Sequence, residues 1–269
     1  GQPVGGPAGL KGPSMVRVTT PEGKGYCIDQ REVTQGEYFE FLYAYLEDPT
    51  VSSKRKEGAP DWPKAPGCEI PRLMPDFIGD IDCDTTPDAF SQKNMRQHHP
   101  IACVNWCNAY SYCAWAGKRL CGRVGGSDGD ASNASGLADA NQSEFYNVCS
   151  QGGKTAYAYG DDHRADIMSS GDIAYYKDGY APDRAAAEAD APTDCHGAIA
   201  PFDAVVNVGC NVAEWQDGCS NSVTLDATCV AHGYAHSETT PEKSSRCDAF
   251  LESTRSQRSP QIGFRCCHD

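Results

Sequence analysis

The sequence predicts an α+β fold that is rich in disulfides, and three observations support this class. Helical hydrophobic patterns occur in the first part of the chain, whereas short apolar segments between Gly, Asp and Pro turns fill the part after residue 157. Strands and helices do not alternate in the order of a βαβ unit. The 269 residues include fifteen cysteines, and their scattered spacing favours a disulfide framework over the close cysteine pairs of zinc sites.

The charge and the cysteines also limit partners and location. A net charge of −14 argues against nucleic acid and anionic membranes, because both bind basic surfaces. No apolar run approaches the roughly 20 residues of a membrane span, so membrane insertion is not expected. Disulfides in this number persist outside the reducing cytosol. We therefore expect an extracellular location, either secreted or at the cell surface, with at least one cysteine left over from intramolecular pairing because fifteen is odd.

The chain begins with a Gly/Pro-rich segment, residues 1–14, that cannot form a helix or a central strand. We expect either a flexible arm or a strap laid over a neighbouring surface. Residues 15–19 alternate and predict a short strand, and residues 26–29 predict a second strand that packs against it. Residues 15–269 are interpreted as one domain with two insertions, which are described below.

The first helix is expected over residues 34–47. Thr34 and Glu37 have the spacing of a capping box, apolar side chains follow at helical spacing, and Pro49 ends the helix.

Residues 50–97 form the first insertion, which is polar and interrupted by prolines. A loop of this length inside a compact domain is usually functional or covalently tied. A bridge between Cys68 and Cys83 would tie it.

A second helix is expected over residues 105–116, with Gly117 as its C-terminal stop. The second insertion, residues 124–141, is rich in Gly, Ser, Asp and Ala. A third short helix is expected over residues 142–150, and only short strands after it.

Several sequence segments carry a resemblance to a known family. Its main motifs are Tyr-Cys-x-Trp-x-Gly-Lys-Arg-Leu at 112–120, Asn-Val-Ala-Glu-Trp at 211–215 and Gly-Phe-Arg-Cys at 263–266, with weaker matches at 28–38 and 99–106. Each motif alone is weak, but their ordered occurrence from about residue 15 to residue 267 resembles the formylglycine-generating enzyme family, the sulfatase-modifying domain. The resemblance implies an irregular variant of the C-type-lectin-like fold.

The resemblance also implies two disulfides. The cysteine of the second helix is Cys113, and its implied partner is Cys266. The cysteine that ends the third helix is Cys149, and its implied partner is Cys247. Two further cysteines bracket the 211–215 motif and are candidates for a local bridge, namely Cys195 and Cys219.

The copper site of the catalytic family members is not retained. Those members hold copper with two cysteines spaced C-x4-C, ten and five residues before the cysteine that matches Cys247. Counting back gives Ser237 and Glu242, and counting from an upstream glycine motif gives Glu238 and a neighbour of Glu242. Hydroxyls and carboxylates do not replace the soft thiolates that Cu(I) requires. We expect no copper, no formylglycine chemistry and no enzymatic activity of that kind.

A calcium ion is implied by the same resemblance. Asn211 and Glu214 match positions that the family uses to ligate structural calcium, and backbone carbonyls such as that of Val212 complete the shell. Oxygen ligands in an acidic chain suit calcium. The alternative is an ordinary turn in which Glu214 pairs with an arginine.

A different metal site is a second hypothesis for the segment where the enzymes keep their thiolates. Cys229, His232 and His236 lie there at spacings that can share one face of a helix or a strand. The alternative is that Cys229 is disulfide-bonded and both histidines are surface residues.

These expectations describe a disulfide-stabilised binding or structural module on a catalytically inactive scaffold. Its partner would be an unidentified protein or glycan ligand, or copies of itself. Two alternatives stay open: a self-assembling subunit of an extracellular filament or surface layer, and a metal-dependent oxidoreductase with a remodelled metal site.

Overall fold

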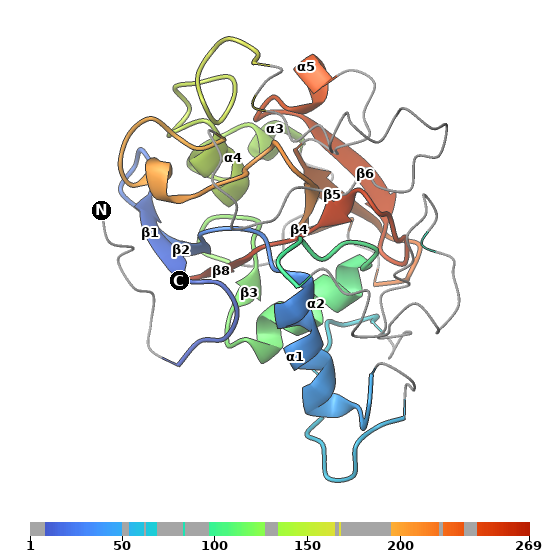
Figure 1. The fold of residues 1–269 in the computed structure, drawn as a ribbon. Helices are drawn as coiled ribbons and strands as arrows, with labels where there is room; N and C mark the ends of the chain where they lie inside the picture. Colours follow the sequence, from blue (N-terminus) through green and yellow to red (C-terminus); the bar gives the residue numbers. More distant parts are fainter. Residues whose placement is uncertain are drawn as a thin grey trace, which may run out of the picture.

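The computed structural model describes residues 9–49, 54–61, 63–68, 83, 97–126, 134–164, 167, 195–220, 223–233 and 241–269. Its described strands form two four-stranded sheets, and its helices pack around them (Figure 1). All fifteen cysteines lie within the described residues. No helix in this part of the chain is long and apolar enough to cross a membrane.

The first sheet joins the two ends of the domain. Its strand order is β1-β2-β8-β3, comprising β1 (Met15–Thr19), β2 (Gly25–Asp29), β8 (Cys266–His268) and β3 (Arg119–Leu120). All neighbouring strands are antiparallel. The C-terminal strand therefore lies between the N-terminal hairpin and the strand that follows the second helix (Figure 1).

The second sheet has the order β6-β5-β4-β7. Its strands are β4 (Ala213–Cys219), β5 (Thr228–His232), β6 (Phe250–Thr254) and β7 (Ile262–Gly263). The β4–β7 pair is parallel, and the other pairs are antiparallel. In β4–β5, Glu214 lies opposite His232 and Cys219 lies opposite Cys229.

The three expected helices are present and slightly shorter than predicted. They are α1 (Gln35–Tyr45), α2 (Trp106–Trp115) and α4 (Glu144–Cys149). The capping box of α1 is confirmed: Thr34 Oγ1 accepts from the Glu37 amide at 3.3 Å, and the Glu37 carboxylate accepts from the Thr34 amide at 2.9 Å. Gly117 follows α2 with φ +78°, a conformation that favours glycine after a helix.

The prediction of strands alone after residue 157 was wrong. A turn of 3-10 helix occurs at Phe202–Ala204, and a short helix, α5 (Pro241–Ser244), begins at a proline, which suits the first turn because its missing amide is not needed there. Another short helix, α3 (Ala134–Leu137), lies within the second insertion.

The buried side chains form two hydrophobic cores. The first packs α1 and α2 against the second sheet and includes Phe41, Tyr112 and Trp215. The second packs β1 and β2 against α4. Adjacent residues of β8 belong to different cores, since Cys266 is part of the first and Cys267 is part of the second. This strand therefore separates and connects the two cores.

Seven disulfides use fourteen of the fifteen cysteines. They are Cys68–Cys107, Cys83–Cys103, Cys113–Cys266, Cys121–Cys267, Cys149–Cys247, Cys195–Cys210 and Cys219–Cys229. The pairs Cys113–Cys266 and Cys149–Cys247 are those that the family resemblance implies. The remaining cysteine, Cys27, is a buried free thiol in β2.

The expected bridge between Cys195 and Cys219 was wrong. Cys195 pairs with Cys210 rather than Cys219, because Asn207 N donates to Cys195 O at 2.8 Å and holds the two segments together. Cys219 instead lies opposite Cys229 in the β4–β5 ladder and bonds to it.

The first insertion is tied, but not within itself. Cys68 pairs with Cys107 at the start of α2, and Cys83 pairs with Cys103 just before α2. The predicted Cys68–Cys83 bridge was therefore wrong. Both bonds anchor the insertion to the segment around the start of α2.

Candidate functional site

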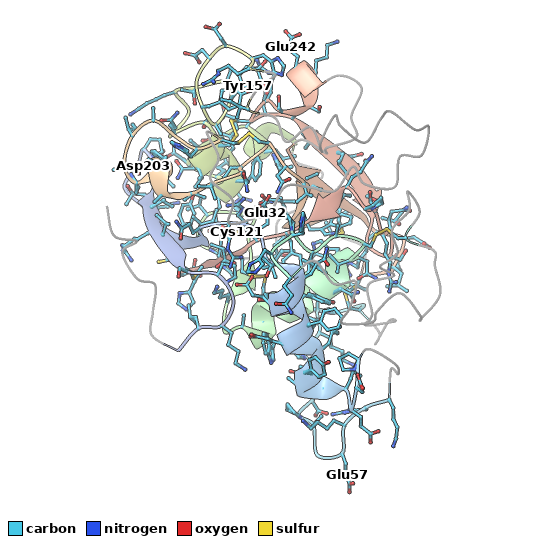
Figure 2. The ribbon with its side chains drawn as sticks, viewed as in Figure 1. Glu32, Glu57, Cys121, Tyr157, Asp203 and Glu242 are labelled. Atoms are coloured by element: carbon cyan, nitrogen blue, oxygen red, sulfur yellow. A yellow bond between two sulfur atoms is a disulfide. The ribbon has the colours of Figure 1, made fainter. Side chains whose placement is uncertain are left out.

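A cluster of buried charges lies between the two sheets. It contains three carboxylates, Asp29, Glu32 and Glu214, and two cations, Lys118 and Arg265. The carboxylate residues and Arg265 are all 0% exposed, and the Lys118 side chain is equally buried. Glu32 lies near the middle of the molecule in Figure 2, whereas Glu57 and Glu242 project at opposite ends. Buried charges at this density are rare without pairing.

Arg265 and Glu214 form a two-pronged ion pair. The Nε of Arg265 donates to Glu214 Oε2 and its Nη2 to Oε1, both at 2.7 Å. The guanidinium also donates to the backbone oxygens of Asp29 at 3.2 Å and Val206 at 3.1 Å. The arginine that precedes β8 thus links β2, β4 and the loop before β4. This is the arginine pairing that the sequence left open as the alternative role of Glu214.

Asp29 and Lys118 form the second ion pair. Lys118 Nζ donates to Asp29 Oδ1 at 2.5 Å, and the backbone amide of Cys266 donates to Oδ2 at 2.9 Å. Burial raises the pKa of Asp29 to about 6, and Lys118 partly offsets that rise. The hydrogen bond from the Cys266 amide to Asp29 fixes the end of β2 against the start of β8.

Among the described residues, no lysine or arginine side chain donates a hydrogen bond to the Glu32 carboxylate. Asn207 Nδ2 donates to its Oε2 at 3.3 Å, and its Oε1 has no hydrogen-bond donor at bonding distance among the described residues. Burial raises the pKa of Glu32 to about 7. Smaller effects act in both directions: the Glu214 charge also raises this pKa, whereas Arg265 and the Asn211 amide lower it. With Glu32 ionised, the cluster carries one more negative charge than positive charge.

The cluster contains oxygen groups of the kind that bind a hard cation such as calcium. Asn211 and Glu214 both lie in it, and the Val212 side chain is buried beside them in the segment that leads into β4. Amide and carboxylate oxygens are the ligands that calcium takes. Each Glu214 oxygen accepts from Arg265 and keeps further acceptor capacity. A bound calcium would neutralise the excess charge and cross-link the loop to β4.

Sequence reasoning missed most of this cluster. Asp29, Glu32, Lys118 and Arg265 all lie inside the motifs that carry the family resemblance, but they had no assigned role. The available signal was a charged residue within an otherwise apolar motif, which is typical of a buried ion pair. Asn207 carries no such signal in the sequence, although its φ of +63° marks an unusual backbone position.

The hypothesis of a metal site at Cys229, His232 and His236 was wrong for Cys229, and its alternative was wrong in placing His232 at the surface. Cys229 is bonded to Cys219 and cannot ligate a metal as a thiolate. His232 is not a surface residue, because it is 0% exposed and its ring lies 4.9 Å from that of Phe145 and 6.1 Å from that of Phe250. His236 lies outside the described residues.

His232 should make the protein acid-sensitive. Burial lowers the pKa of His232 from 6.5 to about 4, although the Cys247 backbone and Asp248 oppose this shift. Between these values the unfolded chain binds a proton that the folded protein does not, so stability is complete above pH 6.5 and falls as the pH drops toward 4. From pH 7.5 to 4.5, we expect wild type to lose about 2.5 kcal/mol more unfolding free energy than His232→Phe.

The measurement is urea unfolding of both proteins at each pH. Asp29 and Glu32 have raised pKa values and act in the opposite direction, but they are common to both proteins and cancel in the difference. His98→Gln, at an exposed histidine, should behave as wild type. Equal losses for wild type and His232→Phe would contradict the prediction.

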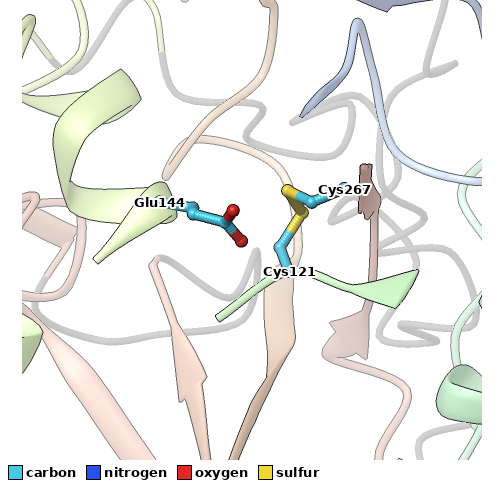
Figure 3. A group of neighbouring side chains, drawn as sticks. All are labelled: Cys121, Glu144 and Cys267. Atoms are coloured by element: carbon cyan, nitrogen blue, oxygen red, sulfur yellow. A yellow bond between two sulfur atoms is a disulfide. The ribbon is translucent and has the colours of Figure 1, made fainter. Parts of the chain in front are cut away.

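A second cluster with metal-ligand chemistry contains Cys121, Glu144 and Cys267 (Figure 3). Its two sulfurs form a disulfide, and the Glu144 carboxylate accepts from Arg119 at 2.5 and 2.7 Å and from the Gly122 amide at 2.9 Å. The two sulfurs and the carboxylate oxygens therefore already take part in other bonds. The cluster is therefore a structural junction between β3, α4 and β8.

The residues present do not fit copper at the position of the family's metal thiolates. Glu242 lies exposed on α5, and Ser237 and Glu238 lie outside the described residues. With fourteen cysteines in disulfides, only Cys27 has a free thiol. A pair of thiolates is consequently not available anywhere in the folded, oxidised chain.

Matches to this chain come from one family model and from solved structures. The family model of the sulfatase-modifying factor enzyme 1-like domain matches residues 13–269. PvdO from Pseudomonas aeruginosa is 18% identical, with 96% of this chain and 94% of that chain covered and a TM-score of 0.45. The corresponding values for CarF are 13%, 96%, 96% and 0.45. No curated protein matches the chain. The chain belongs to the family of sulfatase-modifying factor enzyme 1-like domains, the fold of the formylglycine-generating enzymes.

Proposed function

We propose that this chain is an extracellular binding or structural module that uses the formylglycine-generating enzyme scaffold without its oxidase chemistry. The observation that carries the proposal is the cysteine pairing, which leaves Cys27 as the single free thiol. Cu(I) needs soft ligands, and the family's chemistry uses two thiolates. One buried thiol in β2 does not supply such a site.

The activity test uses a sulfatase-derived peptide that contains the target cysteine. The purified protein is incubated with the peptide, Cu(I) and oxygen, and the peptide mass is measured. We expect no conversion of cysteine to formylglycine, whereas a catalytic family member under the same conditions supplies the positive control. Formation of the aldehyde by this chain, and its loss in Cys27→Ser, would overturn the proposal.

The extracellular setting is supported by the seven disulfides, which an oxidising compartment maintains. The partner is a protein or glycan ligand, or a second copy of the chain. Sedimentation over a hundredfold concentration range separates these cases. A monomer throughout the range supports a ligand-binding module, whereas concentration-dependent growth supports self-assembly.

We also propose that the buried charge cluster binds calcium through Asn211, Glu214 and the backbone carbonyl of Val212. The excess negative charge of the cluster with Glu32 ionised and the buried Glu32 Oε1, which accepts no hydrogen bond from the described residues, support this proposal. After treatment with a chelator, calcium at a hundred times its Kd should raise the unfolding free energy by about 2.7 kcal/mol. Asn211→Ala should abolish the increase, and Glu252→Gln, at an exposed carboxylate, should leave it unchanged. No calcium-dependent shift in wild type would contradict the calcium proposal.

A further inference from the structure

Residues 9–13 form a strap across the C-terminal end of α2. The Lys11 amide donates to Ala116 O at 3.1 Å, and Lys11 Nζ lies 4.1 Å from the centre of the Trp115 ring. Pro13 O accepts from Lys118 Nζ at 2.8 Å. Residues 9–13 therefore lie against the end of α2, and residues 1–8 lie outside the described part of the chain.

Two residues of the strap, Lys11 and Pro13, make three polar contacts with the end of α2 and Lys118. The Lys11 amide donates to Ala116 O, the Lys11 ammonium lies on the Trp115 ring, and Pro13 O accepts from Lys118. Gly12 between them has a φ of +78°, so the strap bends at this glycine. The Ala116 carbonyl is one of the acceptors that a helix leaves unpaired at its C-terminus. Lys11 is exposed and Leu10 is only half-buried, so these residues contribute little to the hydrophobic cores.

The residues beneath the strap are also held in place by bonds to other parts of the fold. Cys113 is bonded to Cys266, and Lys118 is held by Asp29. Tyr112 packs in the first core against Tyr38 and Phe264, and its buried hydroxyl has no hydrogen-bond partner among the described residues. The fit above this hydroxyl is close, because a Cβ added at Gly12 would lie 2.5 Å from it.

We propose that this surface, formed by Tyr112 and residues 115–118, is a peptide-docking site that residues 9–13 occupy in cis. Its ligand is a peptide in which an apolar residue precedes a lysine and a glycine follows it, as in the strap. The lysine lies on Trp115, and main-chain groups pair with Ala116 and Lys118. Such a peptide from another chain binds when the strap leaves. This site is separate from the buried charge cluster's proposed calcium ligands and does not depend on them.

The experiment displaces the strap and supplies its sequence in trans. Gly12→Val places a side chain against the immobile Tyr112 hydroxyl, whereas Gly9→Val is a matched control with a similar positive φ and no atom within 4 Å of its Cβ. A fluorescently labelled peptide, Gly-Leu-Lys-Gly-Pro-Ser, is titrated into the full chains, and anisotropy is measured. We expect saturable binding to Gly12→Val and none to wild type or Gly9→Val, whose sites are filled.

A peptide with alanine in place of lysine should bind Gly12→Val about two- to fivefold more weakly, because it loses the cation–π contact. Circular dichroism and limited proteolysis show whether each variant is folded with its strap released. If Gly12→Val does not fold, Lys11→Glu provides the same test, because it removes the cation on Trp115 at an exposed position. A folded variant with a released strap that fails to bind the peptide would overturn the proposal.

Discussion

Replacing both Cys113 and Cys266 with alanine is expected to lower the free energy of unfolding by about 5 kcal/mol. The bond spans 153 residues, so its loss restores a large conformational freedom to the unfolded chain. Both cysteines are 0% exposed, and the missing sulfurs add a packing defect in the first core. Urea unfolding under non-reducing conditions measures the change. Both residues are replaced together, because a single replacement would leave a second free thiol in addition to that of Cys27.

The matched control removes Cys219 and Cys229 in the same way. That bond spans only 10 residues and links strands that already pair in the β4–β5 ladder. Its loss should cost about 2.5 to 3 kcal/mol by the same dependence on loop length. Equal losses for the two double variants would show that loop length does not govern stabilisation in this protein.

Arg265→Met is expected to cost 3–5 kcal/mol, in the range roughly found when one partner of a buried pair is removed. The substitution leaves the Glu214 charge without its guanidinium partner. Glu214 would then lie near Glu32, whose carboxylate pairs with no cation in the described part of the chain. It also removes the donors to Asp29 O and Val206 O. Thermal and urea unfolding at pH 7.5 measure the loss.

Two further variants define the cause of that loss. Adding Glu214→Gln to Arg265→Met should recover part of the stability, because the unpaired buried charge is then absent. Arg246→Met removes an ion pair with Asp248 whose side chains are 43% and 42% exposed, and it should cost about 1 kcal/mol at most. Similar costs at Arg265 and Arg246 would show that burial of the pair is not decisive.

Local signals in the sequence were sufficient for much of the fold. The capping box at Thr34 and Glu37, the stop at Gly117 and the alternation of residues 15–19 each act within a few residues, and the corresponding elements are present. The family resemblance added the long-range pairs of Cys113 and Cys149. Pairings outside the family pattern were not predictable, because many partners are available to each cysteine and the choice depends on contacts that the fold creates.

The candidate site shows the same limit. Asn211 and Glu214 were expected at the site, but the roles of Asp29, Glu32 and Arg265 depend on bringing β2, β4 and β8 together. Their sequence separation gives no indication of charge pairing. His232 was misjudged for a related reason: a histidine on an amphipathic strand appears exposed until Phe145 and Phe250 cover it.

The position of β8 between β2 and β3 has a consequence for biosynthesis. Cys113 and Cys121 leave the ribosome 153 and 146 residues before Cys266 and Cys267, so both wait as thiols while other cysteines, including the early Cys27, are already present. The first sheet can close only after β8 has been made. Formation of the Cys113–Cys266 and Cys121–Cys267 bonds therefore depends on completion of the C-terminal strand.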